Sequence, residues 1–131
     1  MIGLDTNVLV RFFTMDDPEQ SRRARSLMNS LSAAEPGWVA VASLLELVWV
    51  MKSAMRRDRF EIANALSNLM VRDSIVIEHM ELIERSLHSY RTGRADFADC
   101  LIAASARAAG CSRTVTFDRV AARDAGMELL A

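Results

Sequence analysis

The chain has little of what marks a secreted, disulfide-bonded or membrane protein. It has two cysteines among 131 residues, Cys100 and Cys111, and their spacing matches neither a metal-ligand pattern nor a disulfide framework. A reducing, cytoplasmic location is therefore the simpler expectation. The first apolar run is interrupted by Asp5 and Arg11, so we expect no signal peptide. No apolar run is long enough to span a bilayer, and no membrane partner is expected.

The chain also lacks a net charge of either sign and is almost without lysine. Its formal charge is −1, which by itself does not suggest nucleic acid as a partner. Lys52 is the one lysine, and every other basic residue is arginine. Arginine binds phosphate bidentately, but a GC-rich genome also favours arginine and explains most of this bias.

The length favours one domain over residues 1–131, and an apolar content of 51% is enough for a substantial core. Apolar runs and helical periodicity alternate along the chain. The expected strands lie at 2–4, 38–42, 74–77, 113–117 and 127–130. The expected helices lie at about 8–13, 18–31, 43–55, 62–70, 80–90, 96–109 and 120–125. This order predicts an α/β fold with parallel strands, right-handed crossovers and helices on both faces of the sheet.

Five acids fall at junctions between these elements. Asp5 ends the first strand, and Asp118 ends the fourth. Glu46 lies in the first turn of the helix that we expect to open at residue 43. Asp96 and Asp99 lie three residues apart in the first turn of a late helix, and therefore on one side of it. In a parallel sheet, strand carboxyl ends and the helix starts that follow them share one edge, where ligands bind.

Each acid also has a purely structural interpretation. Asp5 or Asp96 could cap the helix that follows it. Ser43 and Glu46 match a capping box, and Asp118 could open the turn after its strand. Together these interpretations are weaker, because crowded carboxylates repel one another and would hold protons unless a cation balanced them.

Oxygen ligands without histidine or thiolate suit Mg²⁺ or Mn²⁺. A hard cation in an acidic cluster activates water and stabilises the charge on a phosphate in transfer. The acids therefore predict phosphodiester chemistry on a polyanion.

Four segments in a fixed order carry a resemblance to a known family. They are LDTNVL at 4–9, SLLEL at 43–47, DFADCLIA at 96–103 and VTFD at 115–118. These segments resemble the signature blocks of PIN-domain ribonucleases, and the length and order resemble the VapC toxins of bacterial toxin–antitoxin modules. The resemblance runs from Met1 to about Asp124.

The resemblance implies a PIN-like three-layer sandwich with a central parallel sheet of about five strands. It implies a Mg²⁺-dependent endoribonuclease that acts on RNA and is usually a homodimer. By motif position, Asp5, Glu46 and Asp99 match the metal-binding acids. Asp118 matches a more variable fourth acid, and Asp96 matches an accessory one.

Polar residues beside these acids match positions that orient them: Thr6, Asn7 and Thr116. The match is weaker after Asp118, where many relatives carry another acid and an aromatic residue. Here Arg119, Val120 and Ala121 follow.

The resemblance also implies a cognate antitoxin that lays a helix, with an arginine or lysine, into the site. The nearly all-apolar helix around Trp49 and Met51 suits such a helix-in-groove contact. Three further arginines are candidates for RNA phosphate contacts: Arg56, Arg57 and Arg59.

Three other functions are compatible with parts of this pattern. One is a PIN-type nuclease of RNA maturation that has no antitoxin. Another is a receiver-like signalling module, which needs a phosphoacceptor aspartate after the third strand and a lysine near the last. That strand ends at Ile77 and Glu78, and no lysine follows Lys52, so this reading ranks low. A binding protein with a decayed site is the third, and the intact acids argue against it.

Overall fold

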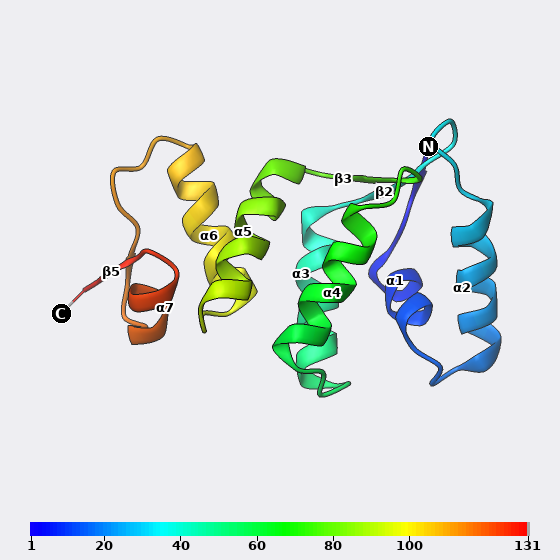
Figure 1. Ribbon diagram of the computed structural model, residues 1–131, viewed down its shortest axis with the longest axis horizontal. Coiled ribbons are helices and arrows are strands. Elements are labelled where there is room, and N and C mark those ends of the chain that lie inside the picture. Colours follow the sequence, from blue (N-terminus) through cyan, green and yellow to red (C-terminus); the bar gives the residue numbers. More distant parts are fainter. Residues whose placement is uncertain (131) are drawn as a thin grey trace. The chain divides into compact units, whose positions relative to one another are not determined.

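The computed structural model describes residues 1–130, in which the chain divides into two compact units (Figure 1). The first unit is Met1–Glu78, and the second begins at His79. Helices alternate with short parallel strands in the predicted order, so the α/β class is confirmed. No helix within residues 1–130 has both the length and the apolar character that crossing a bilayer requires.

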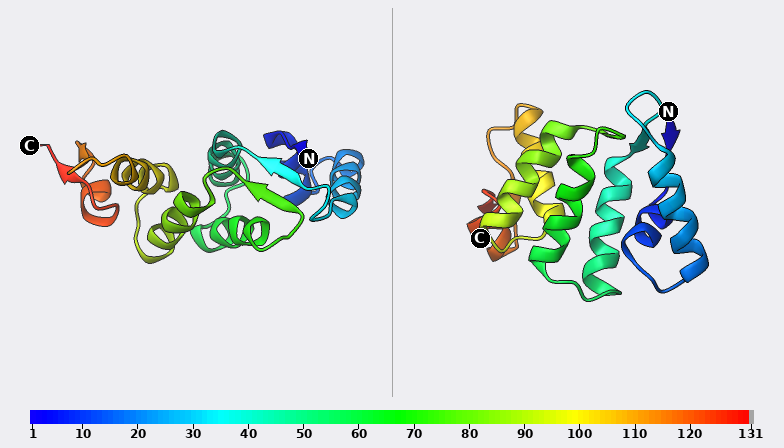
Figure 2. Two further views of the ribbon diagram at one scale, coloured as in Figure 1. Left: turned by 90° about the horizontal axis from the view of Figure 1, so that it is seen from above. Right: turned by 45° about the vertical axis from the view of Figure 1, so that its right-hand side comes forward.

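The first unit carries three strands and four helices over residues 1–78. They are β1 (Ile2–Gly3), α1 (Thr6–Phe13), α2 (Pro18–Ser30), β2 (Gly37–Val39), α3 (Val41–Ser53), α4 (Arg59–Met70) and β3 (Ile75–Ile77). The strands form one parallel sheet in the order β1-β2-β3, in which Trp38 of β2 pairs with Gly3 and Val76. In the view from above, α3 and α4 lie to either side of β2 and β3 (Figure 2).

The second unit carries three helices and two strands up to residue 130. They are α5 (Met80–Thr92), α6 (Phe97–Ala108), β4 (Val115–Thr116), α7 (Arg119–Asp124) and β5 (Glu128–Leu129). Strands β4 and β5 pair in parallel, with Val115 opposite Glu128. Helices α5 and α6 pack side by side, and the rings of Tyr90 and Phe97 meet edge to face at 5.8 Å.

The sheet of the first unit is smaller than the sequence predicts. One central sheet of about five strands was expected, whereas residues 1–130 contain a three-stranded sheet in one unit and a two-stranded sheet in the other. Each strand is only two or three residues long, so few ladder hydrogen bonds are made at any one edge. The predicted parallel pairing is confirmed in both sheets.

Local signals account for two of the helix starts in the first unit, those of α2 and α4. Asp17 caps α2 through a 3.0 Å hydrogen bond that its side chain accepts from the Gln20 N–H, and Pro18 is the first helical residue, as predicted. Asp58 and Glu61 form a capping box at α4.

Apolar helix faces build the core of the first unit. Among its side chains that are less than 2% exposed are six long aliphatic residues of α1, α3 and α4: Leu9, Leu44, Leu47, Ile62, Leu66 and Leu69. Helix α1 packs against α2 and α3, and α3 packs against α4. The core therefore fixes the starts of α1 and α3, which carry two of the predicted acids.

Candidate functional site

Asp5 lies between β1 and α1, where the sequence places it. Its backbone carbonyl accepts the first helical hydrogen bond, from the Val8 N–H at 3.0 Å. Its side chain makes no capping hydrogen bond and is exposed. The interpretation of this carboxylate as a helix cap is therefore wrong, and its oxygens face solvent at the end of a strand. Of the residues expected to orient it, Thr6 is buried in the first turn of α1 and Asn7 is exposed.

Glu46 lies deeper in its helix than the sequence predicts. The expected helix opens at Ser43, but α3 begins at Val41 after Ala40, so Glu46 is in the second turn and the Ser43 capping box is absent. Glu46 remains exposed on a helix that packs against α1.

The early start of α3 has a long-range cause. The Glu78 side chain, at the end of β3, accepts a 2.9 Å hydrogen bond from the Val41 N–H. The Glu78 N–H in turn donates to the Val39 carbonyl at 2.9 Å. Glu78 was not singled out from the sequence, because no local pattern links an acid to a helix start 37 residues earlier.

Asp96 and Asp99 open α6 in the second unit. Asp96 is the N-cap residue, but its side chain makes no capping hydrogen bond, and it is exposed. Its backbone carbonyl accepts from the Cys100 N–H at 3.1 Å. Asp99 is half-buried in the first turn of the same helix. Asp96 thus resembles Asp5, since both are extended residues before a helix whose carboxylates do not cap it.

Asp118 does act as a cap. Its Oδ1 accepts hydrogen bonds from the Val120 N–H at 2.8 Å and the Ala121 N–H at 3.0 Å, at the start of α7. The Thr116 hydroxyl accepts from the Asp118 N–H at 3.0 Å, so Thr116 fixes the backbone that carries this acid. Both side-chain bonds of Asp118 end on one oxygen, and the residue is exposed.

The five acids are divided between the units: Asp5 and Glu46 in the first, and Asp96, Asp99 and Asp118 in the second. Within either unit, over residues 1–130, no three histidine, cysteine, aspartate or glutamate side chains form a group that could hold a metal ion. The donor set consists of carboxylates that are exposed or half-buried, without nitrogen or sulfur, which fits Mg²⁺ or Mn²⁺.

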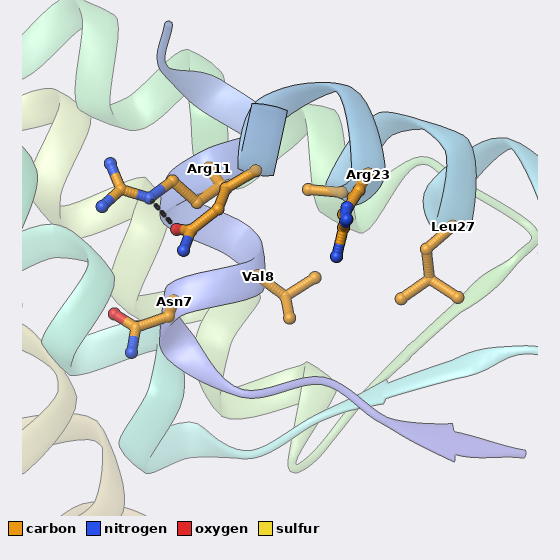
Figure 3. Close-up of a pocket in the computed structure, with 7 residues that line it drawn as sticks. Asn7, Val8, Arg11, Arg23 and Leu27 are labelled. Atoms are coloured by element: carbon orange, nitrogen blue, oxygen red, sulfur yellow. Dashed lines mark hydrogen bonds between the residues drawn. The ribbon is translucent and has the colours of Figure 1, made fainter. Parts of the chain in front are cut away.

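A mostly apolar pocket of about 330 Å³ lies between α1 and α2, and Figure 3 shows its lining. Val8 and Leu27 supply apolar surface, and Asn7 lies at one end. Arg11 Nε donates to Gln20 Oε1 at 2.8 Å across the two helices. Because Asn7 follows Asp5 by two residues, this pocket begins beside the predicted site.

The apolar helix α3 is mostly core. Met51, expected on a docking face with Trp49, is 3% exposed and packs inside the unit, whereas Trp49 is 67% exposed. Of the arginines expected to meet RNA, Arg57 donates to Glu61 Oε2 at 3.0 Å. Arg56 has a left-handed backbone with φ of 52°, and Arg59 is the first residue of α4.

In an α/β fold, ligands bind at the carboxyl ends of the strands, and carboxylates at strand ends and helix starts are the oxygen ligands that Mg²⁺ prefers. The sequence matches the PIN domain over residues 2–126, so the chain belongs to the PIN-domain family. This match covers nearly all of both units. Members are typically metal-dependent nucleases that act on RNA, which supports nuclease as the class of activity. No curated protein matches the chain.

Proposed function

We propose that the chain is a Mg²⁺-dependent endoribonuclease with one PIN domain over residues 1–131. In this proposal Asp5, Glu46 and Asp99 hold the metal, Asp118 adds a fourth acid, and Asp96 is accessory. The observation that carries the proposal is the exposed carboxylate of Asp5, which stands at the N-cap position of α1 and does not cap that helix.

The residues of the proposed site have separate tasks. Asp5, Glu46 and Asp99 would bind Mg²⁺, which supplies an activated water and positive charge beside the scissile phosphate. Thr116 and the two N–H groups of α7 hold Asp118 in one orientation. Thr6 and Asn7 begin the helix that fixes Asp5.

The test is cleavage of a mixed RNA pool by the purified chain, with Mg²⁺ or with EDTA. Asp5→Asn and Asp99→Asn should each lower the rate by at least about 100-fold, because outer-shell partners of metal ligands already contribute about 10- to 100-fold. Asp73→Asn is the matched control, since Asp73 is exposed but lies after α4, away from the predicted motifs. Equal activity in EDTA, or equal loss in Asp73→Asn, would refute the proposal.

We also propose that this nuclease is the toxin of a toxin–antitoxin module and forms a homodimer. Support comes from the VapC-like order of its motifs and from apolar surface next to the acids, in the pocket that Val8 and Leu27 line and at Trp49. An antitoxin helix in that pocket would place a basic side chain near Asp5.

The alternative is an RNA-maturation nuclease without an antitoxin. Expression of the chain alone separates the two. A toxin arrests growth, and the product of an adjacent gene relieves the arrest. A maturation nuclease does neither. Light scattering of the purified chain tests the homodimer.

A further inference from the structure

The second unit contains a polar pocket of about 480 Å³ that has no part in the motifs above. The end of α5, the turn that leads to α6, and α7 line it: Arg91, Thr92, Gly93, Arg94, Arg123 and Asp124. Three guanidinium groups and one carboxylate give the rim a net positive charge. The lining residues are predominantly polar, so the pocket suits a charged ligand better than an apolar one.

Asp124, on α7, accepts hydrogen bonds from two of the residues that line the pocket, Arg94 and Arg123. Its Oδ2 accepts a hydrogen bond from the Arg94 N–H at 2.9 Å, which ties α7 to the turn before α6. Arg123 donates to the same carboxylate, from Nε to Oδ1 at 3.1 Å and from Nη2 to Oδ2 at 3.3 Å. The hydrogen bond from Arg123 is the main cause that lowers the pKa of Asp124, so the Asp124 carboxyl is ionised at neutral pH.

Gly93 lets the turn between α5 and α6 lie close to Asp124 of α7. A Cβ atom at Gly93 would lie 3.0 Å from the Asp124 Cβ and 3.3 Å from its carbonyl oxygen. A larger residue would push α7 away from the turn. The absence of a side chain at this position therefore sets the spacing between the arginines on the turn and the arginine on α7.

The pocket lies directly before two of the proposed catalytic acids. Arg94 precedes Asp96 by two residues, so their Cα atoms are at most about 7.6 Å apart. Arg91 is three residues further back, in the last turn of α5. An anion held here would thus lie close in the chain to the metal that Asp99 is proposed to bind, and so to the phosphate that is cut.

We propose that Arg91, Arg94 and Arg123 bind a backbone phosphate of single-stranded RNA, adjacent to the phosphate that is cut. This inference rests on the proposed nuclease function. Guanidinium groups match phosphate in a bidentate geometry. No aromatic side chain lines the pocket on which a base could stack. The contact therefore positions the strand and does not read its sequence.

Binding of a fluorescein-labelled, 10-nucleotide single-stranded RNA in EDTA tests the site without cleavage. The double variant Arg91→Gln/Arg94→Gln removes two of the contacts, and Arg22→Gln/Arg85→Gln makes the same charge change on α2 and mid-α5. Single-strand binding loses about 0.7 in log–log salt slope for each phosphate contact. The arginines hold one phosphate, so the pocket variant should lose up to about 0.7 in slope and bind at least about 10-fold more weakly at low salt. The control should keep the slope of the wild type.

Arg94→Lys is the second variant, because it keeps the positive charge and removes the guanidinium group that can bind phosphate in a bidentate geometry. Compared with the wild type, Arg94→Lys should keep the salt slope but bind the RNA more weakly. An unchanged slope in the double variant, or an equal loss in the control, would overturn the proposal, and so would a wild type that does not bind the RNA. Circular dichroism melting checks that each variant is folded.

Cleavage in Mg²⁺ separates this proposal from the nuclease assignment. The pocket variant should raise KM for the RNA while kcat changes little, because its arginines position the strand. If the wild type cuts RNA and the variant keeps the same KM, the pocket assignment fails and the nuclease stands. If the wild type binds RNA through these arginines but cuts nothing, the pocket stands and the nuclease fails.

Discussion

Replacing Glu78 with alanine should loosen the start of α3 although the residue lies outside that helix. Glu78 Oε1 is the side-chain acceptor of the Val41 N–H, at 2.9 Å and partly buried. Loss of an N-cap acceptor costs about 1 kcal/mol, within a range of about 0.5–2. Loss of a negative charge at a helix N-terminus adds about 0.3–1 kcal/mol. We expect Glu78→Ala to lower the free energy of unfolding by about 1.3–2 kcal/mol.

Two companion variants separate the hydrogen bond from the charge. Glu78→Gln keeps an oxygen acceptor and removes the charge, so it should lose only the helix-dipole contribution of about 0.3–1 kcal/mol. Glu84→Ala removes an exposed acid of α5, in the second unit, and it should change little.

Urea unfolding followed by circular dichroism gives the free energies, and hydrogen exchange at the Val41 amide gives the local effect. Val41 should lose protection in Glu78→Ala and keep most of it in Glu78→Gln. Equal destabilisation by alanine and glutamine, or a protected Val41 amide in the alanine variant, would refute the assignment of Glu78 as the cap.

Three further predictions concern the second unit. Gly93→Ala should lower the free energy of unfolding by about 1–3 kcal/mol in urea melts, because its Cβ would crowd Asp124 at 3.0 Å; an unchanged melt would contradict this. Asp118→Ala should lose about 1–2 kcal/mol by the same assay, whereas Asp118→Asn, which keeps the Oδ1 acceptor, should lose much less. An equal loss of stability in Asp118→Ala and Asp118→Asn would show that the helix cap does not cause the destabilisation. Arg123→Gln should raise the pKa of Asp124, measured by carboxyl-carbon NMR titration, because the Arg123 hydrogen bond is the main cause that lowers it. The pKa of Asp124 in the folded protein is lowered from 3.8, so the stability that the Arg123–Asp124 pair contributes is present above about pH 4. It is lost as the pH falls through the lowered pKa. A wild type that remains more stable than Arg123→Gln at a pH well below the lowered pKa would refute this linkage.

Elements with local signals could be predicted from the sequence alone. Asp17 and Pro18 sit next to each other in the chain and mark the start of α2 without any tertiary information. The alternation of strands and helices and the junction positions of Asp5 and Asp118 were predicted for the same reason. Four short motifs in order also pointed to the PIN-domain family, which the match over residues 2–126 confirms.

The features that the sequence did not predict depend on residues that are distant from one another in the chain. Ser43 was expected to open α3, but Glu78 moves the start to Val41. Met51 was expected at a docking face because α3 is apolar on nearly every side, and only packing against other helices decides that it is buried while Trp49 is exposed. Arg94 and Asp124 are 30 residues apart, so no spacing rule identifies the pocket that they share.

The cap on α3 also sets an order of events during synthesis. The Val41 N–H leaves the ribosome 37 residues before its acceptor on Glu78 does. At about 5–20 residues per second, that interval lasts roughly 2–7 s. During this interval the first turn of the nascent α3 is without its side-chain partner. The helix that carries Glu46 is therefore completed only after β3 has been made, and the nascent chain cannot present a finished first unit before residue 78 is in place.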